Sequence, residues 1–515
     1  QTAEAPESQV TVTVSPSSIY LSPGFQFQFT ATVTGKKNQS VEWSVDRGTI
    51  DANGVLTAPA TGGLATVTAR SVVARSKKGT ASANILSVPN TYTARTDRAV
   101  VQLPATIPNV GAATGQGTVV VDPDFGMRIS RITDSSTAPR SLLTADGGGG
   151  AIWSVDSKHL ALQSTGSRRF ILSFDPTTLA ATNTPLSYPY ELSFSHTEPN
   201  VIYGLDGTRL VKITTNAAYT TSTEETLFDF VNGSTGAWGT TSQCLEAGFV
   251  PTWDGTFHMA KSDDTFVIGY SNTGNQGTGY YVAVYRTGLG CRVLNTRTGM
   301  ITGNWGDIGS ALDGSGAPLA DRFTMHGVSA TPNRRFATIS YNVATACQKD
   351  PNSPQCKDKK GDPVGCLAGD CPNDSPYFWE IETRKLQLGQ DIDGHHALGF
   401  KGMAVGKHYK LHDYDNPAVP GTILVQPPAA FPDMHGSWQN TNPDDSVPLF
   451  AATADVPSLS TYPCEWYDEI IGIAPDGSGK IYRFAHTFAT GASPYFIAQN
   501  AIGVVSQDGH FVAFT

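Results

Sequence analysis

The sequence predicts an all-β protein in two parts, a β-sandwich followed by a β-propeller. From Gln9 to about Leu86, short runs of alternating apolar and polar residues are separated by turn residues, which is typical of sandwich strands. A hairpin phrase of strand, polar turn and strand then recurs in "GAIWSVDSKHLALQS", "FHMAKSDDTFVIGYS", "MHGVSATPNRRFATISY" and "NAIGVVSQDGHFVAFT". Repetition of one hairpin at intervals of tens of residues indicates a radial β architecture.

The chain of 515 residues is too long for one hydrophobic core, so we expect several parts. We assign residues 1–8 to a polar arm, 9–87 to the sandwich, 88–117 to a Pro- and Gly-rich linker and 118–515 to the propeller. The repeat predicts seven blades, the last of which has about two strands. We expect "TVVVDPDFGMRISRIT", near the start of the propeller region, to supply an outer strand to that blade and so join the two ends of the ring.

The sandwich segment resembles a known family through "SVEWSVDRGTIDANGVLTAP", in which we predict Trp43 as the core aromatic residue. It resembles the bacterial Ig-like domains, and residues 9–87 lack the cysteine pair of antibody domains. This resemblance implies a spacer or adhesive module on a secreted or surface protein. The phrases "SVDSKHLAL", "SQDGHFVAF" and "APDGSGKIYRF" are similar to blades of secreted bacterial β-propellers. That blade phrase is shared so widely that it indicates the fold and not the function.

The composition excludes some functions. The net charge of −10 argues against a nucleic-acid-binding protein. No run approaches the roughly 20 apolar residues that a membrane-spanning helix needs. Because the chain starts at Gln1 and not at Met, we expect a mature secreted or cell-surface protein.

A hydrophilic, cysteine-rich insertion spans residues 345–373. It contains four of the seven cysteines, namely Cys347, Cys356, Cys366 and Cys371. Their spacing does not match the paired CxxC motifs of zinc ribbons, so we predict disulfides that hold a segment with no core of its own. Three pairings remain open. Cys244, Cys291 and Cys464 are left over, and at least one of these three has no partner within the chain.

Histidines open several of the predicted inner strands. They are His258, His326, His396, His435 and, less regularly placed, His196. The inner strands of a propeller converge on one axis, so these imidazoles could form a ring at one mouth. Such a ring could hold a divalent metal (Mn, Zn or Ca) or supply a general base. The alternative for each histidine alone is a structural hydrogen bond between blades.

Two functions compete on this basis. The propeller is loosely similar in architecture to oligogalacturonate and ulvan lyases. A lyase that acts on an extracellular polysaccharide needs a cation and a base, and His326, His396 and His435 could serve as metal ligands or base, with Tyr467 as proton donor. The similarity is architectural, and no lyase motif transfers to these residues. A weaker enzymatic alternative is a hydrolase that uses Glu465 and Glu469. The non-enzymatic alternative is an adhesion or self-assembling matrix protein whose N-terminal arm or last blade contacts another copy. The sequence leaves open whether the protein is an enzyme.

Overall fold

The computed structural model describes most of the chain, and every structural statement below concerns these residues. They are 6–86, 93–104, 106, 108, 117–133, 142–143, 151–164, 169–233, 244–252, 257–272, 279–319, 323, 325–341, 376–389, 396–405, 409–426, 435–439, 442–452, 465–466, 468–488 and 503–514. Strands dominate them, and one short 3-10 helix, η1 (Glu7–Gln9), lies in the predicted arm. No helix among them combines the length and the apolar character that crossing a bilayer requires.

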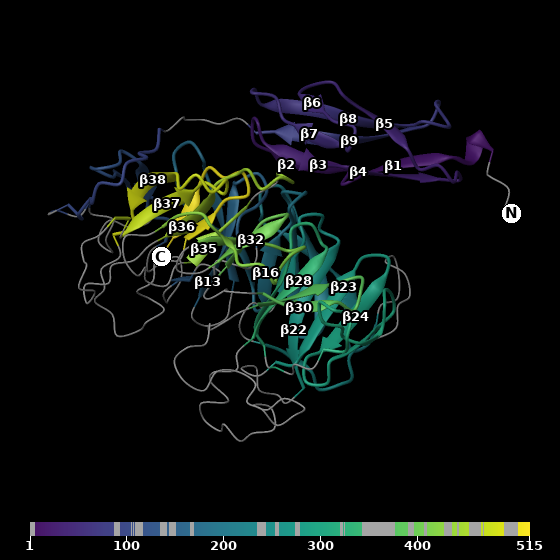
Figure 1. Ribbon diagram of the computed structural model, residues 1–515. Helices are drawn as coiled ribbons and strands as arrows, with labels where there is room; N and C mark the ends of the chain where they lie inside the picture. Colours follow the sequence, from purple (N-terminus) through teal and green to yellow (C-terminus); the bar gives the residue numbers. More distant parts are fainter. Residues whose placement is uncertain are drawn as a thin grey trace, which may run out of the picture.

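The N-terminal part is a sandwich of small sheets (Figure 1). Its strands are β1 (Thr11–Ser15), β2 (Ser18–Leu21), β3 (Gln26–Gln28), β4 (Thr30–Thr34), β5 (Val41–Val45), β6 (Thr49–Ile50), β7 (Val55–Thr57), β8 (Gly63–Ser71) and β9 (Lys78–Ile85). One sheet has the order β2-β9-β8-β5 and a second has the order β3-β7-β6, while β1 pairs with β4. Residues from these sheets share one apolar core.

Alternation along the strands explains this packing. In β8 the side chains of Ala65, Val67 and Ala69 are buried, while those between them are not, because successive strand residues point to opposite faces. Trp43 is partly buried and packs against the same core, as predicted. The strand pattern that we expected is therefore present. The relation to the Ig-like family stays a prediction.

After residue 133, the described residues form seven sheets that follow one another along the chain and are here numbered one to seven. Sheet one contains β12 (Leu142–Leu143), β13 (His159–Ser164), β14 (Arg169–Phe174) and β15 (Ala181–Tyr188), and sheet two contains β16 (Glu191–Phe194), β17 (Val201–Asp206), β18 (Arg209–Thr215) and β19 (Ser222–Asp229). Sheet three contains β20 (Val250–Pro251), β21 (Phe257–Met259), β22 (Thr265–Ser271), β23 (Tyr281–Arg286), β24 (Gly290–Asn295), β25 (Met300–Gly303) and β26 (Gly309–Ser310).

The remaining four sheets continue the same antiparallel meander. Sheet four contains β27 (Met325–Ala330), β28 (Phe336–Tyr341), β29 (Pro376–Glu380) and β30 (Leu386–Leu388), and sheet five contains β31 (His396–Leu398), β32 (Gly402–Val405), β33 (Lys410–Asp413) and β34 (Thr422–Ile423). Sheet six contains β35 (His435–Ser437), β36 (Leu449–Ala452), β37 (Glu469–Ile473) and β38 (Ile481–His486), and sheet seven contains β39 (Gly503–Val505) and β40 (Val512–Phe514).

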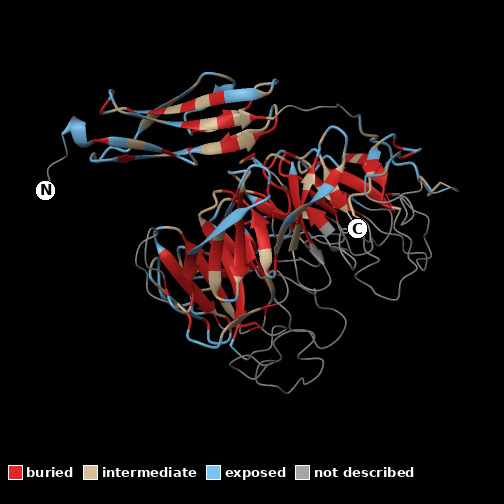
Figure 2. Cartoon of the chain, turned by 180° about the vertical axis from the view of Figure 1, so that it is seen from behind, coloured by how far each residue is buried: buried red, intermediate tan, exposed pale blue. Residues whose placement is uncertain are grey.

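These sheets are arranged as in a β-propeller, because each packs on the next and the last packs on the first. Apolar clusters join sheets one to two, two to three, three to four, four to five and five to six. The backbone N–H of Val505 bonds Ser437 Oγ, which joins sheet seven to sheet six. Trp153 in turn donates from Nε1 to the carbonyl of Val504 at 3.2 Å, and Leu160 shares a core with Ala513. Buried residues fill these strands, whereas the sandwich strands alternate (Figure 2).

The number of seven blades stays a prediction, since sheet seven has two strands in the described part of the chain. The repeated phrase, however, has a common geometry. Its turn contains a residue with positive φ at the same place in five sheets, namely Ser157, Asp263, Arg334, Asp445 and Gly509. This place corresponds to the glycine of the phrase "DG", and a left-handed residue there reverses the chain into the second strand.

The predicted closing strand has a different structure from the one we expected. Residues 117–133, which we name the clasp, form their own hairpin of β10 (Val119–Val121) and β11 (Arg128–Ser130). The turn "DPDFG" lies in the middle of this segment, and the N–H of Gly126 bonds the carbonyl of Asp122 at 2.8 Å. Pro and Gly at these positions favour a tight turn over one continuous strand. In the described residues, β11 makes no ladder with β40.

The clasp nevertheless joins the two ends of the ring through side chains. Ile129 packs with Ala485 of sheet six, in a cluster that also includes Val512 of sheet seven. Ser130 donates from Oγ to the carbonyl of Leu179 in sheet one at 2.7 Å. The segment therefore contacts the first and the last two sheets, by packing rather than by strand addition.

Two other segments attach to sheets six and seven. In the linker, Arg95 exchanges backbone hydrogen bonds of 3.3 and 2.8 Å with Arg483 and so covers the outer edge of β38. In the sandwich, Ser22 donates from Oγ to the carbonyl of Asp508 at 2.8 Å, and the N–H of Gln26 bonds Asn442 Oδ1 at 2.6 Å.

One disulfide is described, and it is not among those predicted. Cys244, which precedes β20, is bonded to Cys291 in β24, with 6.2 Å between the two Cα atoms. The sequence left these two cysteines unassigned because 47 residues separate them. The predicted set, Cys347, Cys356, Cys366 and Cys371, lies outside the described residues.

Candidate functional site

The predicted histidines lie at or near the starts of strands in four successive sheets. His258 lies in β21 and His326 in β27, whereas His396 opens β31 and His435 opens β35. His258 is buried, and His396 Nε2 lies 3.4 Å from Ser329 Oγ of the preceding sheet. The side chains of His326 and His435, and all of Tyr467, lie outside what the structure describes. A metal held by these histidines therefore stays a prediction.

His196 corrects one expectation. It does not open an inner strand but follows β16, and so lies at the opposite end of the strand from the other histidines. There it meets residues that the sequence did not suggest. They come from the ends of inner strands in sheets two, three, six and seven, and we name them the axial polar cluster: His196, Lys261, Gln439 and Gln507.

Hydrogen bonds join this cluster across the ring. Gln507 donates from Nε2 to the carbonyls of Trp153 at 2.7 Å and Ser195 at 3.1 Å, which fixes the orientation of its amide. Its Oε1 therefore faces His196 Nδ1 at 2.6 Å, and Nδ1 must carry the hydrogen of this bond. Sheets one, two and seven are thus connected at the axis.

Lys261 completes the cluster, and its Nζ touches no anion in the described part of the chain. Its Nζ bonds Gln439 Oε1 of sheet six and lies 3.3 Å from His196 Nδ1, which is an N–H group. The side chain is only 6% exposed. Burial lowers the pKa of Lys261 to about 7, and the charge of Asp263 only partly opposes this effect. The partners that the structure describes for an ammonium group at this place are both neutral.

Asp263 lies close to Lys261, but its oxygens are occupied. It accepts hydrogen bonds from Ser195 Oγ at 2.5 Å, Thr197 Oγ1 at 2.7 Å and the N–H of His196 at 2.9 Å. Burial raises its pKa to about 6 in spite of these bonds. Desolvation also lowers the pKa of His196 well below its usual value, and the charge of Lys261 adds to this. Perturbed groups that converge from several sheets mark a candidate functional site.

The predicted pair Glu465 and Glu469 lies elsewhere and is held by arginines. Glu469 is fully buried and accepts two bonds from Arg483, at 2.8 and 2.6 Å. Glu465 forms an ion pair of 2.7 Å with Arg98 of the linker. This arrangement is a structural contact between sheet six and the linker, and it does not favour the hydrolase alternative.

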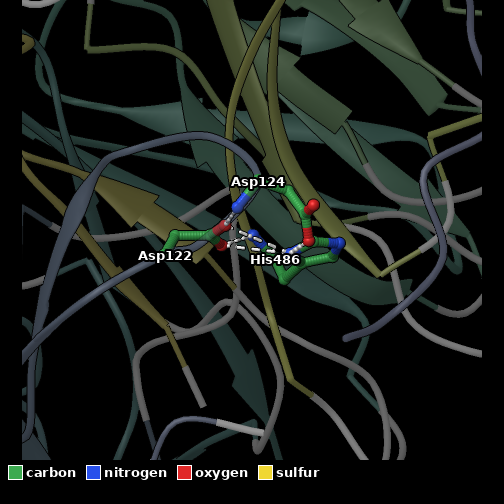
Figure 3. Close-up of side chains that lie close together, drawn as sticks. All are labelled: Asp122, Asp124 and His486. Carbon is green, nitrogen blue, oxygen red and sulfur yellow. Dashed lines mark hydrogen bonds and ion pairs between the residues drawn. The ribbon is translucent and has the colours of Figure 1, made fainter. Parts of the chain in front are cut away.

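A third polar group lies where the clasp meets β38 (Figure 3). It consists of Asp122, Asp124 and His486, whose ligand atoms lie within 4.8 Å of one another. In the described part of the chain, this is the group whose geometry could hold a metal ion. The sequence did not suggest it, because 364 residues separate Asp122 from His486.

Comparisons with known proteins extend only to the fold. No family model and no curated protein matches this chain. Among solved structures, the β-propeller domain of Cps50 (Swd1) from Myceliophteria thermophila is 10% identical to this chain, with a TM-score of 0.29. The match covers 63% of this chain and 82% of that one. Apo AztD from Citrobacter koseri is 9% identical over 72% and 91% of the two chains, with a TM-score of 0.33. An auxiliary nutrient binding protein from Bacteroides thetaiotaomicron is 9% identical over 65% and 96%, with a TM-score of 0.21.

Proposed function

We propose that this protein binds an acidic polysaccharide at the axial polar cluster, as a secreted or cell-surface protein, and does not cleave it. The scaffold would be the predicted seven-bladed propeller, with the predicted Ig-like module as a spacer. One observation carries the proposal. Lys261 is a buried amine at the axis, and among the described residues its Nζ contacts only Gln439 and His196, both neutral.

A buried cation without a counter-charge is costly, because its desolvation is not offset by a contacting anion. A uronate carboxylate at the axis would supply that charge and would hold Lys261 in its ammonium form. Gln439 and His196 are only partly buried, whereas Lys261 is buried. Amide and imidazole groups beside a cation suit the hydroxyl and carboxylate groups of acidic sugars.

Calorimetric titration with uronate oligosaccharides, and with neutral oligosaccharides of equal length, tests the proposal. We expect binding of the acidic series alone. Affinity should fall by up to tenfold per pH unit above about pH 7, where Lys261 loses its proton in the free protein. Lys261→Met should weaken binding at least tenfold and remove this pH dependence.

Lys158→Met is a matched control, since Lys158 lies in the corresponding turn of sheet one but is exposed. A second variant, Gln439→Ala, removes a neutral partner of the amine and should weaken binding less than Lys261→Met. Equal affinity for acidic and neutral sugars, or unchanged binding by a folded Lys261→Met protein, would overturn the proposal.

The lyase alternative predicts a different outcome. Ultraviolet-absorbing unsaturated products, lost on substitution of His326, His396, His435 or Tyr467, would indicate cleavage at the opposite end of the inner strands, with a divalent metal held there. Binding of none of these sugars would instead favour the adhesion or self-assembly alternative, which concentration-dependent sedimentation would then test.

A further inference from the structure

We propose that Asp122, Asp124 and His486 form a binding site for a divalent transition-metal ion, which fastens the clasp to sheet six. This site is separate from the axial polar cluster and from the predicted histidine mouth. It is built by two segments that meet only in the folded ring. The ion would therefore act on the closure of the ring and not on the sugar site.

The two distances between His486 and Asp122 match those between ligands that share a metal ion, and Asp124 would have to move slightly closer. His486 Nδ1 lies 3.1 and 3.3 Å from the two oxygens of Asp122, and 3.9 Å from Asp124 Oδ2 (Figure 3). Charge-assisted N–H···O bonds are usually about 2.7–2.9 Å long, so the contacts with Asp122 are longer than a direct bond favours. Two ligands bonded to one ion at about 2.0–2.2 Å lie roughly 2.8–3.6 Å apart at octahedral to tetrahedral angles.

Asp122 is held firmly in place. Its carboxylate accepts the backbone N–H groups of Asp124 at 2.9 Å, Phe125 at 3.0 Å and His486 at 2.7 Å. These three bonds fix the orientation of the carboxylate, as a metal ligand requires.

His486 supplies an independent observation. Its side chain is fully buried, and its Nε2 has no hydrogen-bond partner among the described residues. With the hydrogen on Nε2, the Nδ1 lone pair points into the space between two carboxylates, where only a cation is stabilising. With the hydrogen on Nδ1, the ring makes just the two long contacts with Asp122. In the first form, an ion at Nδ1 would supply the partner that this nitrogen lacks, whereas Nε2 has no described partner with or without the ion.

The surrounding charges also favour a cation. Four carboxylates and two guanidinium groups gather where the linker, the clasp and sheet six meet: Asp97, Asp122, Asp124, Glu469, Arg95 and Arg483. The charges of the adjacent ion pair, Arg98 and Glu465, cancel and do not change this sum. An excess of two negative charges remains when His486 is neutral, and one divalent ion would neutralise it.

The donor set selects the class of ion. One imidazole nitrogen with two carboxylates suits Mn²⁺ or Zn²⁺, whereas Mg²⁺ prefers oxygen ligands and its own water. The Asp124 side chain is 37% exposed. It therefore offers a path for the ion and room for water ligands.

Thermal unfolding of the full chain, with chelator and then with Zn²⁺, Mn²⁺ or Mg²⁺, tests the site. We expect Zn²⁺ or Mn²⁺ to raise the Tm by at least about 3 °C, and Mg²⁺ to raise it less. Asp124→Asn should abolish this rise and leave the Tm of the metal-free protein within about 1 °C, because Asp124 is partly exposed. Equilibrium dialysis should find one ion fewer per chain in this variant.

Asp476→Asn is the matched control, since Asp476 is an exposed carboxylate in a turn of the same sheet. That variant should keep the full metal-dependent rise. An equal rise in Asp124→Asn and in the wild type would mean that the ion binds elsewhere, for example at the predicted histidine mouth. No rise with either transition metal would also refute the site.

Discussion

Two buried basic residues of this propeller have opposite surroundings. Arg483 in β38 contacts two carboxylates, Glu469 at 2.6 Å and Asp97 at 2.9 Å, and it also exchanges backbone bonds with the linker. Lys261 at the axis contacts an amide and an imidazole. A cation that is paired inside the fold serves the structure. A cation that the fold leaves unpaired is available to an anion from outside.

The largest expected effect comes from breaking the paired cation. Arg483→Met leaves Glu469 buried without a counter-charge, and it should cost about 3–5 kcal/mol of the free energy of unfolding. Urea denaturation measures this loss. The double variant Arg483→Met/Glu469→Leu removes both charges and should recover much of it. A loss below about 1 kcal/mol in the single variant would mean that the pair contributes little.

Lys261 should instead control how stability depends on pH. Its pKa is about 7 in the folded protein and 10.5 ordinarily, so the unfolded chain binds more protons between these values. The free energy of unfolding should therefore rise with pH from 7 to 9, by about 2 kcal/mol at most. Lys261→Met should flatten this rise, whereas Lys158→Met should keep it.

Asp263 should produce a smaller effect of opposite sign at lower pH. Its pKa is about 6 in the folded protein and 3.8 ordinarily, so the folded protein binds the extra proton in this window. Stability should fall by about 1–2 kcal/mol as the pH rises from 4 to 6. Denaturation of Asp263→Asn across the same range should give a nearly flat profile. A slope equal to that of the wild type would assign the effect to another group.

The smallest effect is expected for a partly exposed charge. Without metal, Asp124→Asn should change the free energy of unfolding by less than about 0.5 kcal/mol, because surface charge pairs contribute little. A much larger loss would indicate that Asp124 stabilises the clasp directly, and it would weaken the contrast between buried and exposed charges.

The sequence predicted the elements of the fold better than their associations. Alternating residues in β8 and the polar turn of the repeated hairpin are local signals, and the structure has both features. The clasp was misjudged because its own turn at Gly126 pairs the segment with itself. The bond between Cys244 and Cys291 depends on the fold of sheet three, which sequence spacing does not contain.

The axial polar cluster was beyond sequence reasoning for a similar reason. His196 and Gln507 are 311 residues apart, and Lys261 and Gln439 are 178 apart. Only the order of sheets around the axis brings them together. A usable signal was nevertheless present: His196, Lys261 and Gln507 each occupy the position directly after the first residue of the turn that follows an inner strand. The predicted site rested instead on histidines at the starts of these strands.

The position of the clasp has a consequence for biosynthesis. Asp122 emerges from the ribosome long before His486, from which 364 residues separate it. The β10–β11 hairpin must therefore wait for almost the entire chain before its docking surface exists. Contacts of such long sequence separation form late and slow the folding reaction. Until then the first sheet lacks its neighbour, Trp153 has no Val504 to contact, and the nascent chain carries an exposed apolar surface that invites association with other chains.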